Sequence, residues 1–258
     1  AGDAQEARRQ ARKAENLLAE PPLTMLLSAQ AAQMSGDDTA ASKFFEKMSE
    51  RKDTKYLGIH GMLNQAIQEG DKDVALDLAE QANDLNPKTD NVSKALFELQ
   101  VQSGNWEEAE ETVRKAVKDK HLDTDIGRRR RAVILYQRSA EAESNGKLSD
   151  ALNFAKRANN LVPGFVPAAV RTSRLLQGAG KRRKAASVIE EIWVTNPHPQ
   201  LVDVMEELSS GVGAQEKLRS VEKLASYNKD HEESHLAIAK SALVAEMWTE
   251  ARQHLEAI

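Results

Sequence analysis

Apolar and small residues recur along most of the chain at spacings of three and four residues. In the segment that begins at Gly70, for example, Ala75, Ala79 and Ala82 follow at offsets of five, nine and twelve residues. Because an α-helix completes a turn in about 3.6 residues, these offsets lie on one face of a helix. The pattern predicts amphipathic helices and no sheet.

This helical face repeats with a nearly constant period. Glycines followed by a polar residue are spaced by 34 residues three times, then by 42 and by 34: Gly2, Gly36, Gly70, Gly104, Gly146 and Gly180. Such a glycine is typical of a helix C-cap and turn. An alanine five residues later lets two helices approach closely, and Pro87, Pro163 and Pro197 end three of the second helices. Each unit is therefore predicted to be a pair of antiparallel helices.

A period of 34 residues is that of the tetratricopeptide repeat (TPR), which the chain resembles in its second helices and terminal prolines. The first helices differ, because residues such as Leu63, Ala66, Phe97 and Ser139 replace the usual Trp, Gly and Tyr. The resemblance implies an all-α, right-handed superhelical TPR solenoid of about seven repeats.

The period also divides the chain. We expect one solenoid over 1–258, made of the second helix of a truncated repeat (1–21), three regular repeats (22–120), an insertion that extends a helix (121–131), two further repeats (132–197) and irregular repeats (198–258), the last of them truncated. The eight extra residues between Gly104 and Gly146 should make the longest helix.

Composition agrees with helices and excludes several kinds of site. The chain has 37 Ala and 26 Leu among 258 residues, and only 4% of its residues are aromatic. It has no cysteine, which excludes disulfides, thiol catalysis and Cys-ligated metal centres. Basic and acidic residues number 36 and 40, so bulk charge does not indicate a nucleic-acid partner.

Several segments of the chain resemble one particular family of TPR proteins. The segment Leu26–Gln33 with Gly36-Asp37 and Ala40-Ala41 is similar to the first full repeat of HemY-type proteins, and Phe165–Ala169, Gly180–Lys184 and Pro197-His198-Pro199 are similar to their later repeats. The resemblance implies the soluble TPR region of a bacterial inner-membrane protein, facing the cytoplasm, whose partners are enzymes of haem or porphyrin biosynthesis. The membrane helices of that family would precede this sequence, and the resemblance carries over no catalytic residue.

A short motif could be taken for a zinc protease. His231-Glu232-Glu233-Ser234-His235 matches the H-E-x-x-H pattern, in which two imidazoles on one helix face bind zinc. Asp230 and Glu233, however, form a plausible capping pair that places the motif in the first turn of a helix, and only His254 is a nearby third ligand. We expect no metal here.

The insertion carries four consecutive basic residues, Arg128, Arg129, Arg130 and Arg131. They form either a solvated helix start balanced by nearby aspartates or a ridge that docks anionic lipid headgroups or an acidic partner. No aromatic side chains interleave with them, which argues against nucleic acid.

First helices line the surface on which TPR arrays usually take peptides. Helical phasing places on it a mixture of charged, polar and aromatic candidates: His60, Asn64, Lys94, Tyr136, Arg171 and Arg174. The last three should form a positive segment beside the arginine ridge.

These observations favour a non-enzymatic scaffold that binds other proteins, has no cofactor and is HemY-like. One alternative is a generic TPR adaptor in envelope or secretion assembly. Another is a haem-handling or metal-dependent enzyme. The sequence contains neither a phosphate-binding loop nor a nucleophile motif that would support an enzyme.

Overall fold

The computed structural model describes residues 9–10, 13, 21–87 and 90–258. That part of the chain contains fourteen α-helices, one short 3₁₀-helix and no strand, as the sequence predicts. The chain divides into two compact units, Ala1–Asp123 and Thr124–Ile258, each described here by itself. The second helix predicted at 1–21 lies almost wholly outside the described residues.

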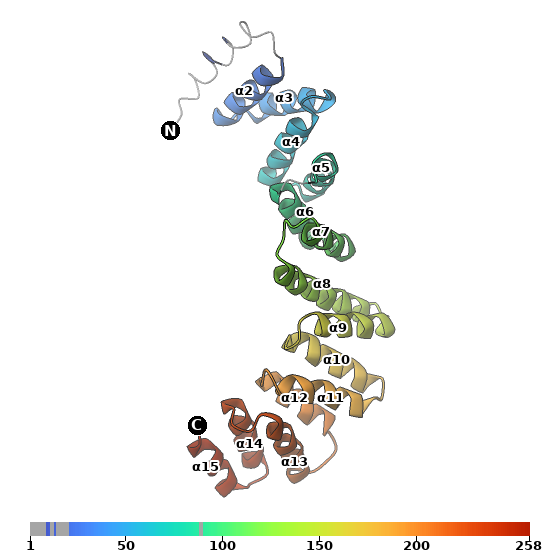
Figure 1. Ribbon diagram of the computed structural model, residues 1–258, viewed down its shortest axis with the longest axis vertical. Helices are drawn as coiled ribbons and strands as arrows, with labels where there is room; N and C mark the ends of the chain where they lie inside the picture. The colour runs from blue at the N-terminus through green and yellow to red at the C-terminus, as the bar shows by residue number, and fades with distance from the viewer. Residues whose placement is uncertain (1–8, 11–12, 14–20, 88–89) are drawn as a thin grey trace. The chain divides into compact units, whose positions relative to one another are not determined.

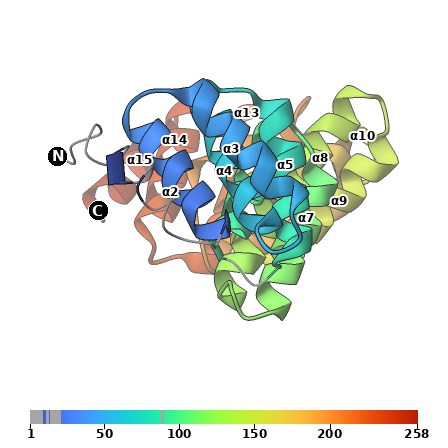
Figure 2. The ribbon, with the colours of Figure 1, turned by 90° about the horizontal axis from the view of Figure 1, so that it is seen from above.

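Consecutive helices pack in pairs within each unit (Figures 1 and 2). The first unit contains α2 (Pro21–Met34), α3 (Asp38–Glu50), α4 (Lys55–Glu69), α5 (Lys72–Leu85), α6 (Asp90–Gln102) and α7 (Trp106–Lys118). The second contains α8 (Thr124–Ser144), α9 (Leu148–Leu161), α10 (Val166–Gly178), α11 (Arg182–Trp193), α12 (Pro199–Leu208), α13 (Ala214–Ala225), η1 (Ser226–Asn228), α14 (Glu232–Val244) and α15 (Trp248–Glu256). Even-numbered helices are the first helices of their pairs, and odd-numbered helices are the second helices.

The turn inside each pair has the predicted chemistry. Five of its glycines take a left-handed conformation, with φ between 72° and 77°: Gly36, Gly70, Gly104, Gly146 and Gly180. Asp71 shows what the polar neighbour adds, because its side chain accepts a hydrogen bond of 3.2 Å from the Val74 N–H and so caps α5. In the last pair Glu246 adopts φ 60° at the equivalent place without being a glycine.

The alanine five residues after each turn is the point of closest packing. At most 1% of its surface is exposed in six pairs: Ala41, Ala75, Ala109, Ala151, Ala185 and Ala251. The Ser139 hydroxyl of α8 donates a hydrogen bond of 2.8 Å to the Ala151 carbonyl of α9, and Ser173 does the same to Ala185 at 3.0 Å. A side chain from the first helix can reach the backbone of the second only because the alanine is small.

Helix α8 has 21 residues and is the longest helix of the described chain, which confirms the expectation for the inserted segment. It begins at Thr124, where the second unit begins. The largest buried cluster of that unit includes Trp193, whose indole N–H donates to the Ser234 hydroxyl at 3.1 Å. This bond joins α11 to α14.

The division of residues 1–258 into the repeats given in the sequence analysis, as one solenoid, stays a prediction.

Replacing Ala151 by Leu should lower the free energy of unfolding by about 1–3 kcal/mol, because the added atoms have no space between α8 and α9. Urea denaturation followed by circular dichroism measures the change. Leu148→Ala in the same helix is the control, since Leu148 is 60% exposed and its loss should cost little. Equal stability of Ala151→Leu and the parent would contradict the close packing.

Candidate functional site

The structure places the predicted binding residues in both units. His60, Asn64 and Lys94 lie on α4 and α6 of the first unit. Tyr136, Arg171, Arg174 and the four consecutive arginines lie on α8 and α10 of the second. Two groups of them are brought into contact, one around Arg171 and one around His60.

Arg171 lies between two side chains of α8. Its guanidinium carbon is 4.8 Å from the centre of the Tyr136 ring, and its Nη1 atom is ion-paired with Glu143. Tyr136 in turn meets Phe165 edge to face, with ring centres 6.0 Å apart. The cation–π contact and the ion pair together join α10 to α8 on the face that the sequence assigned to partners.

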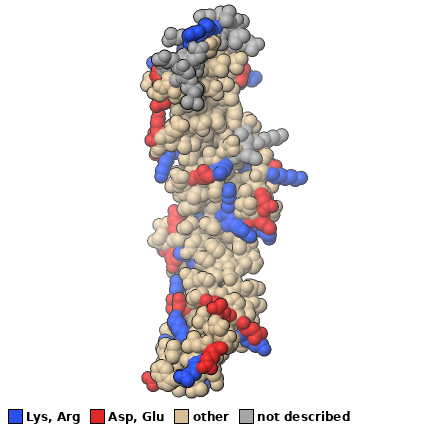
Figure 3. Space-filling view, turned by 90° about the vertical axis from the view of Figure 1, so that its left-hand side faces the viewer, with Lys and Arg blue, Asp and Glu red and all other residues tan. Residues whose placement is uncertain are grey.

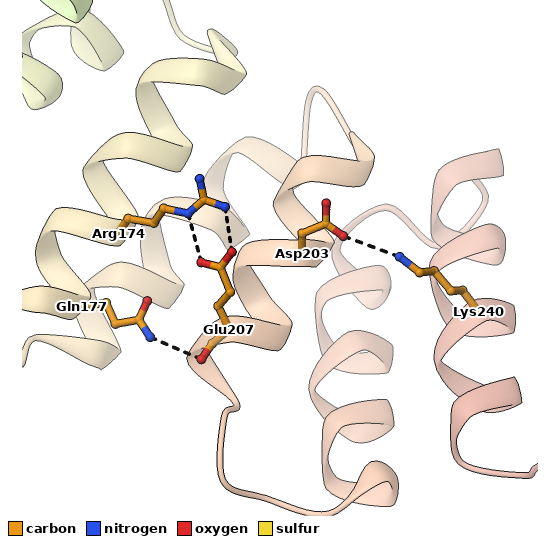
Figure 4. A network of polar contacts seen from close by, with 5 residues as sticks. All are labelled: Arg174, Gln177, Asp203, Glu207 and Lys240. Atoms are coloured by element: carbon orange, nitrogen blue, oxygen red, sulfur yellow. Dashed lines mark hydrogen bonds and ion pairs between the residues drawn. The ribbon is translucent and has the colours of Figure 1, made fainter. Parts of the chain in front are cut away.

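The next first helices are joined in the same way (Figure 4). Arg174 donates two hydrogen bonds to the Glu207 carboxylate of α12, of 3.0 and 2.7 Å, and Gln177 donates to the Glu207 carbonyl. Asp203 of α12 is 3.5 Å from Lys240 of α14. Bonding to Arg174 lowers the pKa of Glu207 below its ordinary value. We call this series of pairs, from Glu143–Arg171 through Arg174–Glu207 to Asp203–Lys240, the charge ladder.

The ladder changes the electrostatic picture of this face. The sequence predicted a positive segment here, but Arg171 and Arg174 each face a carboxylate from a neighbouring first helix. On the surface shown in Figure 3, acidic and basic side chains likewise lie beside one another in small groups. Helical phasing did not reveal the carboxylates that face these two arginines.

The four consecutive arginines do not form a uniform ridge. Arg128 and Arg129 are exposed, whereas Arg130 and Arg131 are half-buried. Arg128 is also ion-paired with Asp125, one turn earlier in α8. At most two of these arginines are therefore exposed enough to contact a membrane or a partner protein.

The first unit offers a different face. On α4 the exposed or half-exposed residues Leu57, His60, Asn64 and Ile67 follow at spacings of three, four and three, so they share one side of the helix. The Asn64 side-chain amide lies 3.4 Å from His60 Nδ1. Lys94 of α6 is 3.9 Å from Glu98 and belongs to neither contact.

Helix α2 also exposes apolar side chains. Leu23, Leu27 and Met34 are 48%, 38% and 54% exposed, and Leu57 and Ile67 on α4 are 42% and 46% exposed. We call these five residues the apolar strip. Sequence reasoning named only His60 and Asn64 on this face, because Leu and Ile in a helical pattern look like core residues.

The H-E-x-x-H segment does not bring its histidines together. His231 is the N-cap of α14, and its Nδ1 accepts a hydrogen bond of 3.1 Å from the Glu233 N–H. The predicted capping role of Asp230 is therefore wrong, because the imidazole takes it. His235, one turn on, points instead to His254 of α15, with 2.9 Å between the two Nδ1 atoms.

His235 and His254 lie near two carboxylates, Glu222 of α13 and Glu250 of α15. Burial lowers the pKa of His254, the nearby His235 lowers it further, and Glu222 acts in the opposite direction. Burial and a hydrogen bond to Glu250 raise the pKa of Glu222. Within the described residues no group of three or more His, Asp and Glu side chains could hold a metal ion.

Comparison with known proteins agrees with the repeat geometry. The family model described as Tetratricopeptide repeat matches residues 66–128, which cover α5, α6, α7 and the start of α8. The fold is the TPR fold. The glycine turns, the alanine contacts and the helix pairs described above are its repeating parts.

One curated protein and two solved structures are similar to this chain. The probable magnetosome protein Mms48 of Magnetospirillum gryphiswaldense is 27% identical over 161 residues, which are 62% of this chain and 36% of Mms48. The chain therefore spans about a third of that relative. The structure of Naa15/Naa10 bound to HypK-THB is 13% identical and covers 93% of this chain and 38% of its own, with a TM-score of 0.57. A thermophilic TPR protein from Thermus thermophilus is 20% identical over 73% of this chain and 99% of its own, with a TM-score of 0.31.

None of these matches names HemY or haem. Among the described helices, none combines the length and apolar composition that crossing a bilayer requires.

The two neighbours of His254 should shift its pKa in opposite directions, which can be tested by replacing each of them. The pKa of His254 lies below its ordinary value of 6.5, so below pH 6.5 the unfolded chain takes up this proton before the folded chain does, and the folded state loses stability. His235→Gln should raise the pKa of His254 by removing the imidazole that lowers it, and Glu222→Gln should lower it by removing a carboxylate that raises it. The His254 C2-proton shift in an NMR titration measures both. Shifts of the same sign in the two variants would contradict the arrangement.

Proposed function

We propose that the chain is a non-enzymatic scaffold that binds other proteins, and that the apolar strip of the first unit is its main contact surface. The observation that carries this proposal is the exposure of five large apolar side chains on the first helices of two successive repeats. Leu23 and Leu57 are 34 residues apart, and so occupy the same position on α2 and α4.

The physical argument favours the apolar strip over the charge ladder. Covering apolar surface gains about 25 cal/mol for each Å² removed from water. The ladder's charged groups already have partners, and a protein that covers them must remove their water without supplying a new counter-charge. The strip gains free energy on binding, whereas the ladder mainly holds the first helices of the second unit in place.

The strip also suggests the kind of partner. Leu57 and Ile67 lie at the two ends of the α4 face, and the hydrogen-bonding His60 and Asn64 lie between them. An amphipathic helix with apolar residues at spacings of three and four and a polar residue among them matches this arrangement.

The HemY resemblance makes the proposal more specific. It would make the partners enzymes of haem biosynthesis and would place the chain at the inner membrane. A generic adaptor in envelope or secretion assembly uses the same strip with other partners. Identifying the proteins captured from membranes by the full-length protein separates these two proposals.

The test compares capture of membrane-extract proteins by the parent and by a Leu57→Ser, Ile67→Ser double variant. We expect the double variant to lose most of the captured protein, at unchanged helical content. The matched control is Leu148→Ser with Val212→Ser, which changes two exposed apolar residues of the second unit. Equal capture by the parent and the Leu57, Ile67 variant, or equal losses in both variants, would refute the strip as the contact.

A second candidate function is contact with an anionic membrane surface. Ile126 and Val133 are 47% and 49% exposed at the start of α8, and the exposed Arg129 lies on the same side between them. Arg128→Ser with Arg129→Ser should then abolish co-sedimentation with phosphatidylserine vesicles at low salt. Arg130 and Arg131 are left unchanged because they are half-buried. Unchanged vesicle binding in this variant would end the membrane proposal.

A further inference from the structure

A cavity of about 270 Å³ lies on the opposite, second-helix side of the first unit, between α5 and α7. Its floor comes from α6 and includes Leu96 and Gln100. Its walls carry carboxylates, Glu80 and Asp84 on α5 and Glu108 on α7. The two second helices therefore present rows of like charge to one another across an open space.

These carboxylates differ from those of the charge ladder. Within the described part of the chain, Glu80, Asp84 and Glu108 have no ion-pair partner, while Glu111 on the same wall is paired with Arg114 at 2.9 Å. Lys115 and His121 also line the cavity. Like charges that face one another unpaired cost stability, and a cation placed between them removes that cost.

The floor adds an independent observation. Gln100 is only 4% exposed, and its Oε1 accepts a hydrogen bond of 2.8 Å from the Thr112 hydroxyl. Its side-chain NH₂ group borders the cavity and donates to no acceptor among the described residues. The NH₂ group reaches the open cavity, where it can donate to a carbonyl oxygen of a bound segment, and the carboxylates of the walls attract a cation.

We propose that this cavity receives a Lys or Arg side chain from a basic segment of a partner protein, with a backbone carbonyl of that segment accepting the hydrogen bond from Gln100. The cavity is smaller than a typical cofactor site, which has room for about 300–1,000 Å³, and has space for one long side chain. A bare polyamine has the positive charge but no carbonyl, and no three carboxylates among the described residues are placed to hold a metal ion.

The acidic residues around the cavity continue into a neighbouring groove. The neighbouring groove between α3 and α5 has a volume of about 430 Å³ and is lined by Glu46, Glu69, Asp71, Asp73 and Asp77 without a basic residue among the described ones. Over the whole first unit, residues 1–123 carry 23 acidic and 16 basic side chains, whereas residues 124–258 carry 17 and 20. An extended segment with several basic residues can thus occupy both grooves.

This cavity is separate from the apolar strip, which lies on first helices. An experiment can therefore refute one of the two proposals without refuting the other. The experiment uses the full chain and a fluorescein-labelled (Gly-Ser-Lys)₄ peptide in low salt, read by fluorescence anisotropy. Glu80→Gln with Asp84→Asn and Glu108→Gln should weaken binding about tenfold. The control, Glu50→Gln with Glu191→Gln and Glu256→Gln, makes the same charge change at exposed residues outside both grooves and should bind like the parent. Equal weakening in the two triple variants would overturn the site.

Two further arms identify the occupant. Gln100→Met should weaken binding of the peptide and leave binding of spermine unchanged, because only the peptide has carbonyl groups. Loss of both ligands, or of neither, would overturn the role of Gln100 and with it the peptide assignment. Sedimentation of the chain alone tests for a second copy as occupant. Self-association that the cavity variant abolishes would show that the basic segment belongs to this chain and not to another protein.

Discussion

The close approach of two helices at a small residue is the constraint on which this structure depends. At Ala151 and Ala185 the second helix comes near enough for a serine hydroxyl of the first helix to bond its backbone carbonyl. Between α3 and α4 the approach is closer still, since a Cβ atom on Gly58 would lie 2.4 Å from the backbone nitrogen of Ser49. Helices that meet over small residues, within a pair or between two pairs, leave their larger side chains for the remaining helix faces and for the outer surfaces.

Those outer surfaces differ between the units because the remaining positions are free to vary. In the second unit the first helices carry charged residues that reach the next pair, so Arg174 and Glu207 stabilise the stacking of α10 on α12. In the first unit the same side carries Leu57 and Ile67, which no neighbouring helix of the described chain covers. A repeated backbone thus supports paired charges on α10 and α12 and uncovered apolar side chains on α2 and α4.

The periodic features could be predicted from the sequence because they depend on local geometry. The turn glycines, the buried alanines and the long α8 all follow from spacing along one helix pair. The contacts of Arg174 could not be predicted, since Glu207 is 33 residues away and phasing gives a direction without a partner. Leu57 was overlooked for a related reason: α4 also buries Ile59 and Leu63, and an apolar residue in a largely apolar helix does not reveal which side faces solvent.

The central claim is that partner proteins bind the first unit at its exposed apolar residues and do not contact the charge ladder. Hydroxyl-radical footprinting of the full chain, free and bound to its captured partner, tests this claim directly, because oxidation reports the solvent exposure of individual side chains. The account predicts protection of Met34, Leu57 and Ile67 in the complex and unchanged oxidation of Tyr136. Protection of Tyr136 with unchanged oxidation of Met34, Leu57 and Ile67 would contradict it.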